Sequence, residues 1–263
     1  MCTLIVLDRL ISGYPLLAAA NRDEFYARPA SPPQALDADP WVVGPRDEQA
    51  GGTWIGVSDG GLFAGLTNRP RGEARDAARP SRGEVTLRAL RAGSMEAILS
   101  DIGTLPEGTY DGFHLFFAGS DGAGIVAHGP GGYARRLRPG VHVLTNQGLS
   151  LSGDAKGRRI RELLGDEGAL GSAEATLSVL EGILADHAGE NVLDRVCIHS
   201  EHYGTRSATL LAIHRSDPGR SIYRHTEGPS CNSPWKDVSD LFKSAPRWRP
   251  AGSSAGSSGG GKG

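Results

Sequence analysis

The stretch CTLIVLDRLISGYPLLAAANRDE, residues 2–24, decides the fold of this chain. Its two apolar runs, 3–7 and 16–20, are separated by turn-forming residues, and this pattern is typical of a β-hairpin. A turn centred near residues 11–12 would pair the two strands so that Cys2 lies opposite roughly Asn21. The sequence therefore predicts that the polar run Asn-Arg-Asp-Glu at the end of this stretch lies beside a thiol at the start of the chain.

Cys2 is the first candidate for chemistry. An initiator methionine before a small residue is commonly removed, and its removal would leave Cys2 with a thiol and a free α-amine. A terminal amine has a pKa of about 7.7–8.0, so it can act as the base for its own nucleophile without a histidine. The competing interpretation is that Cys2 is a small buried apolar residue at the start of a strand. Asn21 or Asp23 would then simply cap a turn at a solvated strand end.

Composition excludes several classes of protein. The chain has 263 residues, enough for a sizeable core, and Lys+Arg 28 against Asp+Glu 30 argues against a nucleic-acid partner. Its three cysteines, Cys2, Cys197 and Cys231, make a poor disulfide framework, so we expect a reducing, cytoplasmic location. Residues 9–20 resemble a signal peptide only weakly, because Gly13 and Pro15 interrupt them. No apolar run is long enough to span a bilayer.

The order of elements predicts an α+β fold, since strands, two helices, strands, two helices and strands follow one another. Residues 29–40 are expected to form a surface loop, and Ser81 with Glu84 forms a capping box that begins a helix. Residues 1–245 are expected to form one domain, with a disordered Gly/Ser-rich tail at 246–263. Expected strands beyond the hairpin cover residues 50–57, 62–68, 113–117, 124–127, 133–137, 142–146, 195–199, 207–214 and 221–225, and expected helices cover 81–99 with a break near residue 93, 156–164 and 173–187.

Polar residues recur at the ends of the expected strands. Asn68 and Asn146 each end a strand, and Arg206 precedes one. A cysteine that attacks an amide needs hydrogen-bond donors where the oxyanion forms, and asparagine side chains can supply them. Arg22 or Arg206 would lower the pKa of a nearby thiol, while Asp23 would orient the terminal amine.

Several motifs together resemble the NRDE family, also called the transport and Golgi organization protein 2 family. The similarity extends to about Leu241, and the family in turn resembles the N-terminal-nucleophile (Ntn) hydrolases. That resemblance implies a four-layer αββα sandwich of two antiparallel sheets between helix layers. The motifs that carry it are Met1-Cys2, Asn21-Arg22-Asp23-Glu24, Ala50-Gly51-Gly52-Thr53-Trp54, Leu66-Thr67-Asn68, Ser81-Arg82-Gly83, Gly112-Phe113-His114-Leu115 and Tyr203-Gly204-Thr205-Arg206-Ser207-Ala208-Thr209.

A more distant likeness, to cholylglycine hydrolases and penicillin V acylases, implies the chemistry. In those enzymes the cysteine after the initiator methionine is the nucleophile, and the strand ends that carry their asparagines look like 64–68 and 143–146 here. They place arginine and aspartate three residues apart, whereas Arg22 and Asp23 are adjacent in this chain. The resemblance implies a cysteine hydrolase or acyltransferase of an amide, or a thioester, in a small acylated substrate. Asn68 and Asn146 would stabilise the oxyanion, and no cofactor is needed.

Two other functions stay open at this stage. Because animal members of the NRDE family are implicated in haem trafficking and lipid metabolism, the chain could instead carry haem or a lipid cofactor. Cys197 and His199 would share one face of a strand and offer soft ligands. No second Cys/His pair accompanies them in the sequence, so no metal site is predicted. The chain could also be a scaffold that keeps the Ntn fold without the chemistry.

Overall fold

The structure is a computed structural model, and it describes residues 2–70, 76, 78–150, 154–243 and 245. The tail expected at 246–263 lies outside the described residues. Two seven-stranded antiparallel sheets make up the centre of the molecule. The first sheet has, in order across it, β11 (Gly148–Leu149), β10 (Gly140–Thr145), β1 (Cys2–Ile11), β2 (Tyr14–Phe25), β12 (Tyr203–Ile213), β13 (Ile222–Thr226) and β14 (Lys236–Asp237).

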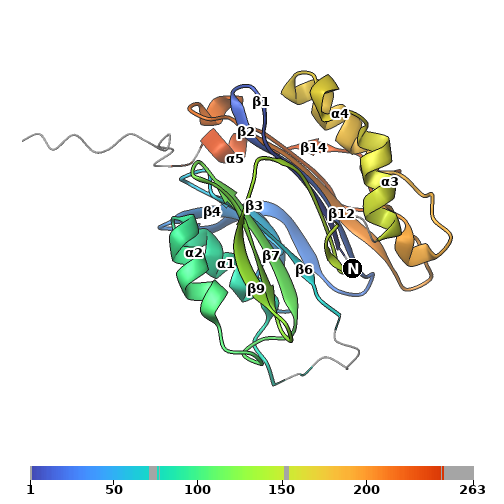
Figure 1. Cartoon of the computed structure of the whole chain (residues 1–263). Helices are drawn as coiled ribbons and strands as arrows, with labels where there is room; N and C mark the ends of the chain where they lie inside the picture. The colour runs from blue at the N-terminus through green and yellow to red at the C-terminus, as the bar shows by residue number, and fades with distance from the viewer. Residues whose placement is uncertain (1, 71–75, 77, 151–153, 244, 246–263) are drawn as a thin grey trace, which may run out of the picture.

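The second sheet follows the sequence order of its strands. It comprises β3 (Ala30–Ala38), β4 (Trp41–Asp47), β5 (Ile55–Ser58), β6 (Phe63–Asn68), β7 (Phe113–Gly119), β8 (Gly122–His128) and β9 (Tyr133–Leu137). The helices are α1 (Arg82–Arg91), α2 (Met95–Asp101), α3 (Ala155–Leu164), α4 (Ala173–Leu184) and the short α5 (Asp240–Lys243). Figure 1 shows α1 and α2 outside the second sheet and α3 and α4 outside the first. This arrangement confirms the predicted αββα sandwich.

Strand β1 is apolar on both faces because both faces are covered. Leu4 and Val6 pack in the core between the two sheets, whereas Ile5 and Leu7 pack against α3 and α4. Side chains alternate across a strand, so a strand covered on both sides has a continuous apolar run rather than an alternating one. A third core lies between the second sheet and α1 with α2. No helix among the described residues is long and apolar enough to cross a membrane.

The hairpin forms as predicted, but its register differs by one residue. Cys2 pairs with Arg22, not with Asn21. Arg9 adopts a positive φ of 58°, and the register shifts between Asp8 and Ile11, as in a β-bulge. The bulge absorbs an extra residue in β1 beside the turn. Since side chains alternate, this shift moves Arg22 onto the face that Cys2 occupies.

Two local expectations were wrong, and the strand expected at 50–57 begins only at Ile55. Residues 29–40, predicted as a loop, contain β3, which is an edge strand. Its prolines are tolerated because an edge strand needs only one of its two sides for pairing. Residues 195–199, predicted as a strand, form irregular chain after the 3₁₀ turn Val192–Asp194, with one isolated bridge between His199 and Gly204. Their apolar side chains cover the sheet without joining it.

Candidate active site

Cys2 and Arg22 project from the same face at one end of the first sheet. They are paired residues of neighbouring antiparallel strands, so their side chains point the same way. Both line a cavity of about 70 Å³ at the amino-terminal end of β1, and Asn68, Trp54 and Arg82 line it too. A thiol therefore lines the same cavity as hydrogen-bond donors from both sheets.

Asn146 holds the main-chain nitrogen of Cys2. Its Oδ1 accepts a hydrogen bond from that nitrogen at 3.0 Å, and its Nδ2 donates to the carbonyl oxygen of Asn68 at 2.6 Å. A main-chain N–H only donates and a carbonyl oxygen only accepts, so these two partners determine which way the amide is turned. Asn146 thus connects the start of the chain with the end of β6.

Strand pairing explains why Asn146 reaches this position. Leu4 of β1 pairs with Leu144 of β10, so the residue just beyond β10 lies level with Cys2. The hydroxyl of Thr67 donates to the carbonyl oxygen of Thr145 at 3.0 Å and joins β6 to β10 across the two sheets. The site is therefore assembled where two strand ends from different sheets meet.

Arg22 is buried and held between an aromatic ring and a carboxylate. Its guanidinium carbon lies 4.3 Å from the centre of the Trp54 ring, and its Nη2 lies 3.6 Å from Asp47 Oδ2. Arg28 binds the same Asp47 oxygen at 2.8 Å. Burial lowers the pKa of Arg22, and the neighbouring Cys2, Glu24 and Asp47 act in the opposite direction. Nη1 of Arg22 is buried with no hydrogen-bond partner among the described residues.

Asp23 lies on the opposite face of β2, behind the site. Its Oδ1 accepts a hydrogen bond from Thr205 Oγ1 at 2.7 Å. Burial raises the pKa of Asp23 to about 6, although the positive charge of Lys156 lowers it. Lys156 is itself buried at the start of α3 and donates to Thr3 Oγ1 at 3.3 Å. Asp23 is therefore a buried carboxylate beneath the helix layer, close to the start of the chain.

The surroundings of Cys2 oppose ionisation of its thiol. Burial raises its pKa above the ordinary value, and the carboxylate of Asp23 adds to that effect. The positive charge of the chain's amino terminus, the main-chain N–H of Asp23 and the guanidinium of Arg22 act the other way. Cys2 therefore needs a base to become a thiolate.

The family model described as "Transport and Golgi organisation 2" matches residues 1–227. The chain belongs to the Transport and Golgi organisation 2 family. The family homolog of Bos taurus is 29% identical over 235 residues, which are 77% of this chain and 83% of that protein. The Homo sapiens homolog is 27% identical over 244 residues, with the same shares covered. The resemblance to this family that the motifs carry is confirmed.

Solved structures show which fold this family member shares. The C2A mutant of the conjugated bile acid hydrolase from Clostridium perfringens superposes with a TM-score of 0.56 at 13% identity, covering 91% of this chain and 93% of that one. Penicillin V acylase from Agrobacterium tumefaciens gives 0.52 at 14% identity, covering 92% and 88%. This likeness confirms the expected Ntn-hydrolase-like fold for the family member.

The predicted site residues of this family member fall into two groups. Cys2, Arg22 and Asn68 line one cavity, and Asn146 is hydrogen-bonded to the main chain of two of them, Cys2 and Asn68. Asp23 lies behind the strand. Arg206 occupies a bulge between Thr205 and Ser207 and is not among the described residues that line the cavity. Asn21, also in the early motif, is structural: its Nδ2 donates to the main-chain oxygens of Leu184 and Val196.

The structure adds cavity residues to which the sequence assigned no role. Trp54 and Arg82 belong to motifs that carry the family resemblance, but nothing in their local pattern indicates that they line one cavity. They do so because the loop 51–54 crosses the first turn of α1 at very close range. A Cβ atom on Gly52 would clash with the main chain of Gly83, so only glycine fits there. Close backbone approach of this kind is a known use of glycine.

Proposed function

We propose that this chain is an N-terminal cysteine hydrolase or acyltransferase. It acts on the amide bond, or a thioester bond, of a small acylated substrate and forms a thioester with Cys2. The observation that carries the proposal is the hydrogen bond from the Cys2 nitrogen to Asn146 Oδ1, made at the edge of a cavity that Cys2 shares with Arg22 and Asn68. A purely structural cysteine requires neither a side-chain acceptor for its nitrogen nor a place on a polar cavity.

Removal of Met1 would turn the held nitrogen into an α-amine next to its own thiol. With Asn146 Oδ1 accepting one N–H, the amine lone pair takes the thiol proton, and the thiolate attacks the substrate carbonyl carbon. The ammonium then gives its proton to the leaving amine as the C–N bond breaks. A thioester remains on Cys2, and water or an acceptor amine resolves it.

The charges around Cys2 support this proton transfer. Because burial raises the pKa of the thiol, its proton leaves only when a base lies within reach. Asp23, with a pKa of about 6, is ionised at neutral pH and stabilises the ammonium that forms. The guanidinium of Arg22 stabilises the thiolate, and its unpartnered Nη1 offers a further donor to a bound substrate.

The two asparagines take different roles in this mechanism. Both ends of the Asn146 amide are engaged, one with Cys2 and one with Asn68, so Asn146 orients the amine rather than binding the oxyanion. The side chain of Asn68 lines the cavity, so it is the candidate oxyanion donor. This division revises the expectation that both asparagines bind the oxyanion.

The cavity also bears on the substrate. At about 70 Å³ it is smaller than the roughly 300–1,000 Å³ typical of small-molecule sites, so it admits only the groups next to the scissile bond. Its lining includes the arginines at positions 22, 28 and 82 and the carboxylates of Glu24, Asp47 and Asp111. This lining favours a polar group next to the carbonyl that reacts.

The first experiment measures the intact mass of the purified protein and then labels it with an electrophilic acyl probe. We expect a mass without Met1 and a label on Cys2, although Cys231 is the more exposed thiol. Peptide mapping locates the label, and Cys2→Ala serves as the matched control. Retention of Met1, or a label that follows exposure and falls on Cys231, would contradict the proposal.

A further inference from the structure

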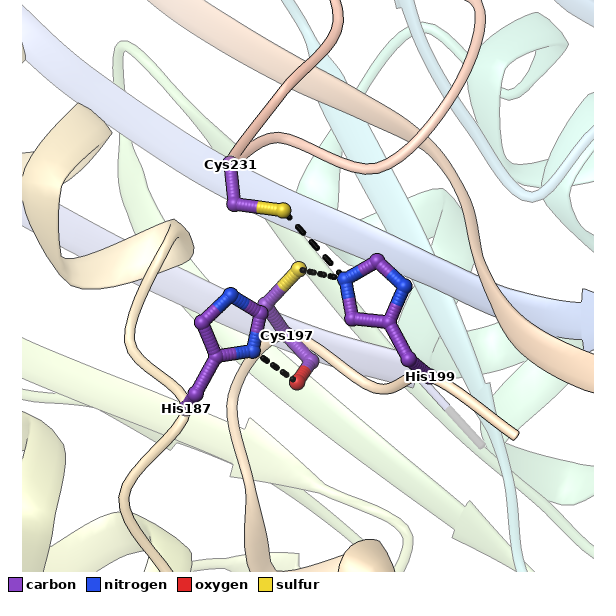
Figure 2. Close-up of side chains that lie close together, drawn as sticks. All are labelled: His187, Cys197, His199 and Cys231. Atoms are coloured by element: carbon purple, nitrogen blue, oxygen red, sulfur yellow. Dashed lines mark hydrogen bonds between the residues drawn. The ribbon is translucent and has the colours of Figure 1, made fainter.

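Four soft side chains that do not line the cavity of Cys2 come together elsewhere in the molecule. They are His187, Cys197, His199 and Cys231, and each offers one ligand atom within 4.8 Å of the ligand atoms of the other three. Figure 2 shows both sulfur atoms directed at one nitrogen of His199. His199 Nε2 lies 3.3 Å from the Cys231 sulfur and 3.7 Å from the Cys197 sulfur.

Three separate segments supply these side chains. His187 follows α4, Cys197 and His199 lie in the irregular chain before β12, and Cys231 lies in the loop after β13. The sequence indicated Cys197 and His199 as possible ligands but not their two partners. His187 lies 10 residues before Cys197, and Cys231 lies 32 residues after His199, so no short motif joins the four. Only the fold shows that a second Cys/His pair exists.

Two distances within the cluster fit a tetrahedral ion. With zinc–sulfur bonds of about 2.3 Å and zinc–nitrogen bonds of about 2.0–2.1 Å, a tetrahedral site places sulfur and nitrogen about 3.5 Å apart. The two measured nitrogen–sulfur distances, 3.3 Å and 3.7 Å, fall on either side of that value. A set of two thiolates and two imidazoles favours zinc over magnesium or calcium, which prefer oxygen.

The surroundings of the cluster also suit a metal. His187 Nδ1 lies 3.2 Å from the carbonyl oxygen of Cys197. In the tautomer that donates this hydrogen bond the free lone pair is on Nε2, and such a bond to a backbone carbonyl is the usual second partner of a metal-binding histidine. The main-chain N–H of Cys197 donates to the main-chain carbonyl oxygen of Asp186 at 2.9 Å, and this bond holds the segments of Cys197 and His187 together. His187, His199 and Cys231 are exposed, so an ion can enter.

We propose that His187, Cys197, His199 and Cys231 bind one zinc ion in a closed, structural site. All four positions are supplied by the protein, so none is left for water or substrate. The ion would join the end of α4, the segment before β12 and the loop after β13. Among the described residues these segments contribute few regular elements of their own, so a shared ion would stabilise them directly.

The proposed ion also bears on the Cys2 region through a chain of hydrogen bonds. Ile198, between the two central ligands, donates its N–H to Thr205 Oγ1 at 2.9 Å. Thr205 Oγ1 in turn donates to Asp23 Oδ1 at 2.7 Å. The zinc site would therefore hold the segment that positions Asp23. The zinc proposal does not depend on the activity proposed for Cys2.

Two alternatives use the same side chains and predict different measurements. A Cys197–Cys231 disulfide would consume both thiols and leave the histidines without a role. Haem takes four ligands from its porphyrin and at most two from the protein. Four protein ligands gathered around one point therefore match a single ion better than they match haem.

The test is zinc binding by the full chain, without an affinity tag, after chelation and reduction. We expect one zinc per chain by elemental analysis, and a cobalt-substituted form with the visible absorption of tetrahedral cobalt bound to thiolate. Zinc should also raise the Tm of the wild-type protein. Failure to bind zinc, or a mass lower by two hydrogens that maps to a Cys197–Cys231 disulfide under reducing conditions, would overturn the proposal.

Matched variants distinguish the cluster from other thiols and imidazoles. Cys231→Ser and His199→Ala should both lose stoichiometric zinc and the zinc-dependent rise in Tm. Cys231 lies in an exposed loop, so its serine variant is expected to fold. Cys2→Ser and His202→Ala, the latter an exposed histidine three residues from His199, should keep both properties. Zinc retained by Cys231→Ser at wild-type stoichiometry would place the metal elsewhere.

Discussion

The two cysteine regions of this molecule are built in opposite ways. Cys2 belongs to the central strand pairing, and its partners Arg22 and Asn146 are placed by β-sheet register. Cys197 and Cys231 lie in irregular segments, and the packing of these segments brings their side chains together. A site placed by register lies on a rigid element, which suits reacting groups that must be held accurately. A site assembled from loops gains most from an ion that joins them.

Thr205 is the point at which the two regions meet. Its hydroxyl accepts from Ile198 on the cysteine–histidine side and donates to Asp23 on the Cys2 side. Both hydrogen bonds are buried, so neither partner has water as a substitute. Substitutions can therefore test the Cys2 region and the cysteine–histidine cluster separately, and a substitution of Thr205 can test the connection between them.

The largest effect is expected at the nucleophile. Cys2→Ala should lower turnover of an acylated substrate by at least about 10³-fold, because it removes the nucleophile of the proposed mechanism. Cys2→Ser should retain part of the activity, since the same amine can activate a hydroxyl. Turnover and urea unfolding are measured together. Equal activity of the wild type and Cys2→Ala, with both folded, would remove Cys2 from the mechanism.

A smaller effect is expected where Asn146 orients the amine. Asn146→Ala removes the acceptor of the Cys2 nitrogen and should lower kcat by about 100-fold, since reacting groups lose rate steeply when misplaced. Asn146→Asp keeps an oxygen acceptor and should lose less. Single-turnover acylation with a reactive ester checks this order. If the two variants are equally impaired, the role of Asn146 lies in its bond to Asn68.

Asp23 should make stability depend on pH. Its pKa of about 6 in the folded protein exceeds the ordinary value of 3.8, so the folded state holds the proton more tightly. The stability that this carboxyl contributes is therefore complete below about pH 4 and is lost as the pH rises through 6. Relative to Asp23→Asn, the wild type should lose on the order of 3 kcal/mol between about pH 4 and pH 7.

Urea unfolding of both proteins across this range gives the difference directly. The buried imidazoles of His114 and His225, with pKa values of about 4, titrate in the same window, but they are present in both proteins and cancel. A difference in unfolding free energy that does not change with pH would mean that Asp23 is ionised with an ordinary pKa.

The smallest effect is expected at the link between the two regions. Thr205→Val keeps the shape but leaves the Ile198 N–H and Asp23 Oδ1 without this partner, which should cost about 1–3 kcal/mol of unfolding free energy. Thr205→Ser keeps the hydroxyl and is the control. The unfolding free energies of the two variants are measured by denaturant unfolding. Equal stability of the valine and serine variants would show that the hydroxyl does not join the regions.

Sequence patterns predicted the sheets well and the register less well. The apolar runs 3–7 and 16–20 correctly predicted the paired strands of the hairpin, and Asn68 and Asn146 were correctly expected at strand ends. The bulge at Arg9 was missed, because turn-forming residues indicate a turn but not an extra residue beside it. That single residue decides which member of the early motif shares a face with Cys2.

By itself, the sequence determined the order of strands and helices, the hairpin and the thiol at its start, because periodicity and turn chemistry are local properties of a chain. Only the tertiary structure decided that Asn146 holds the Cys2 nitrogen, that Asp23 lies behind the strand, and that His187 and Cys231 join Cys197 and His199. Those placements depend on which distant strands pair and on how irregular segments cross. Both follow from the packing of the whole molecule, and no local pattern records them.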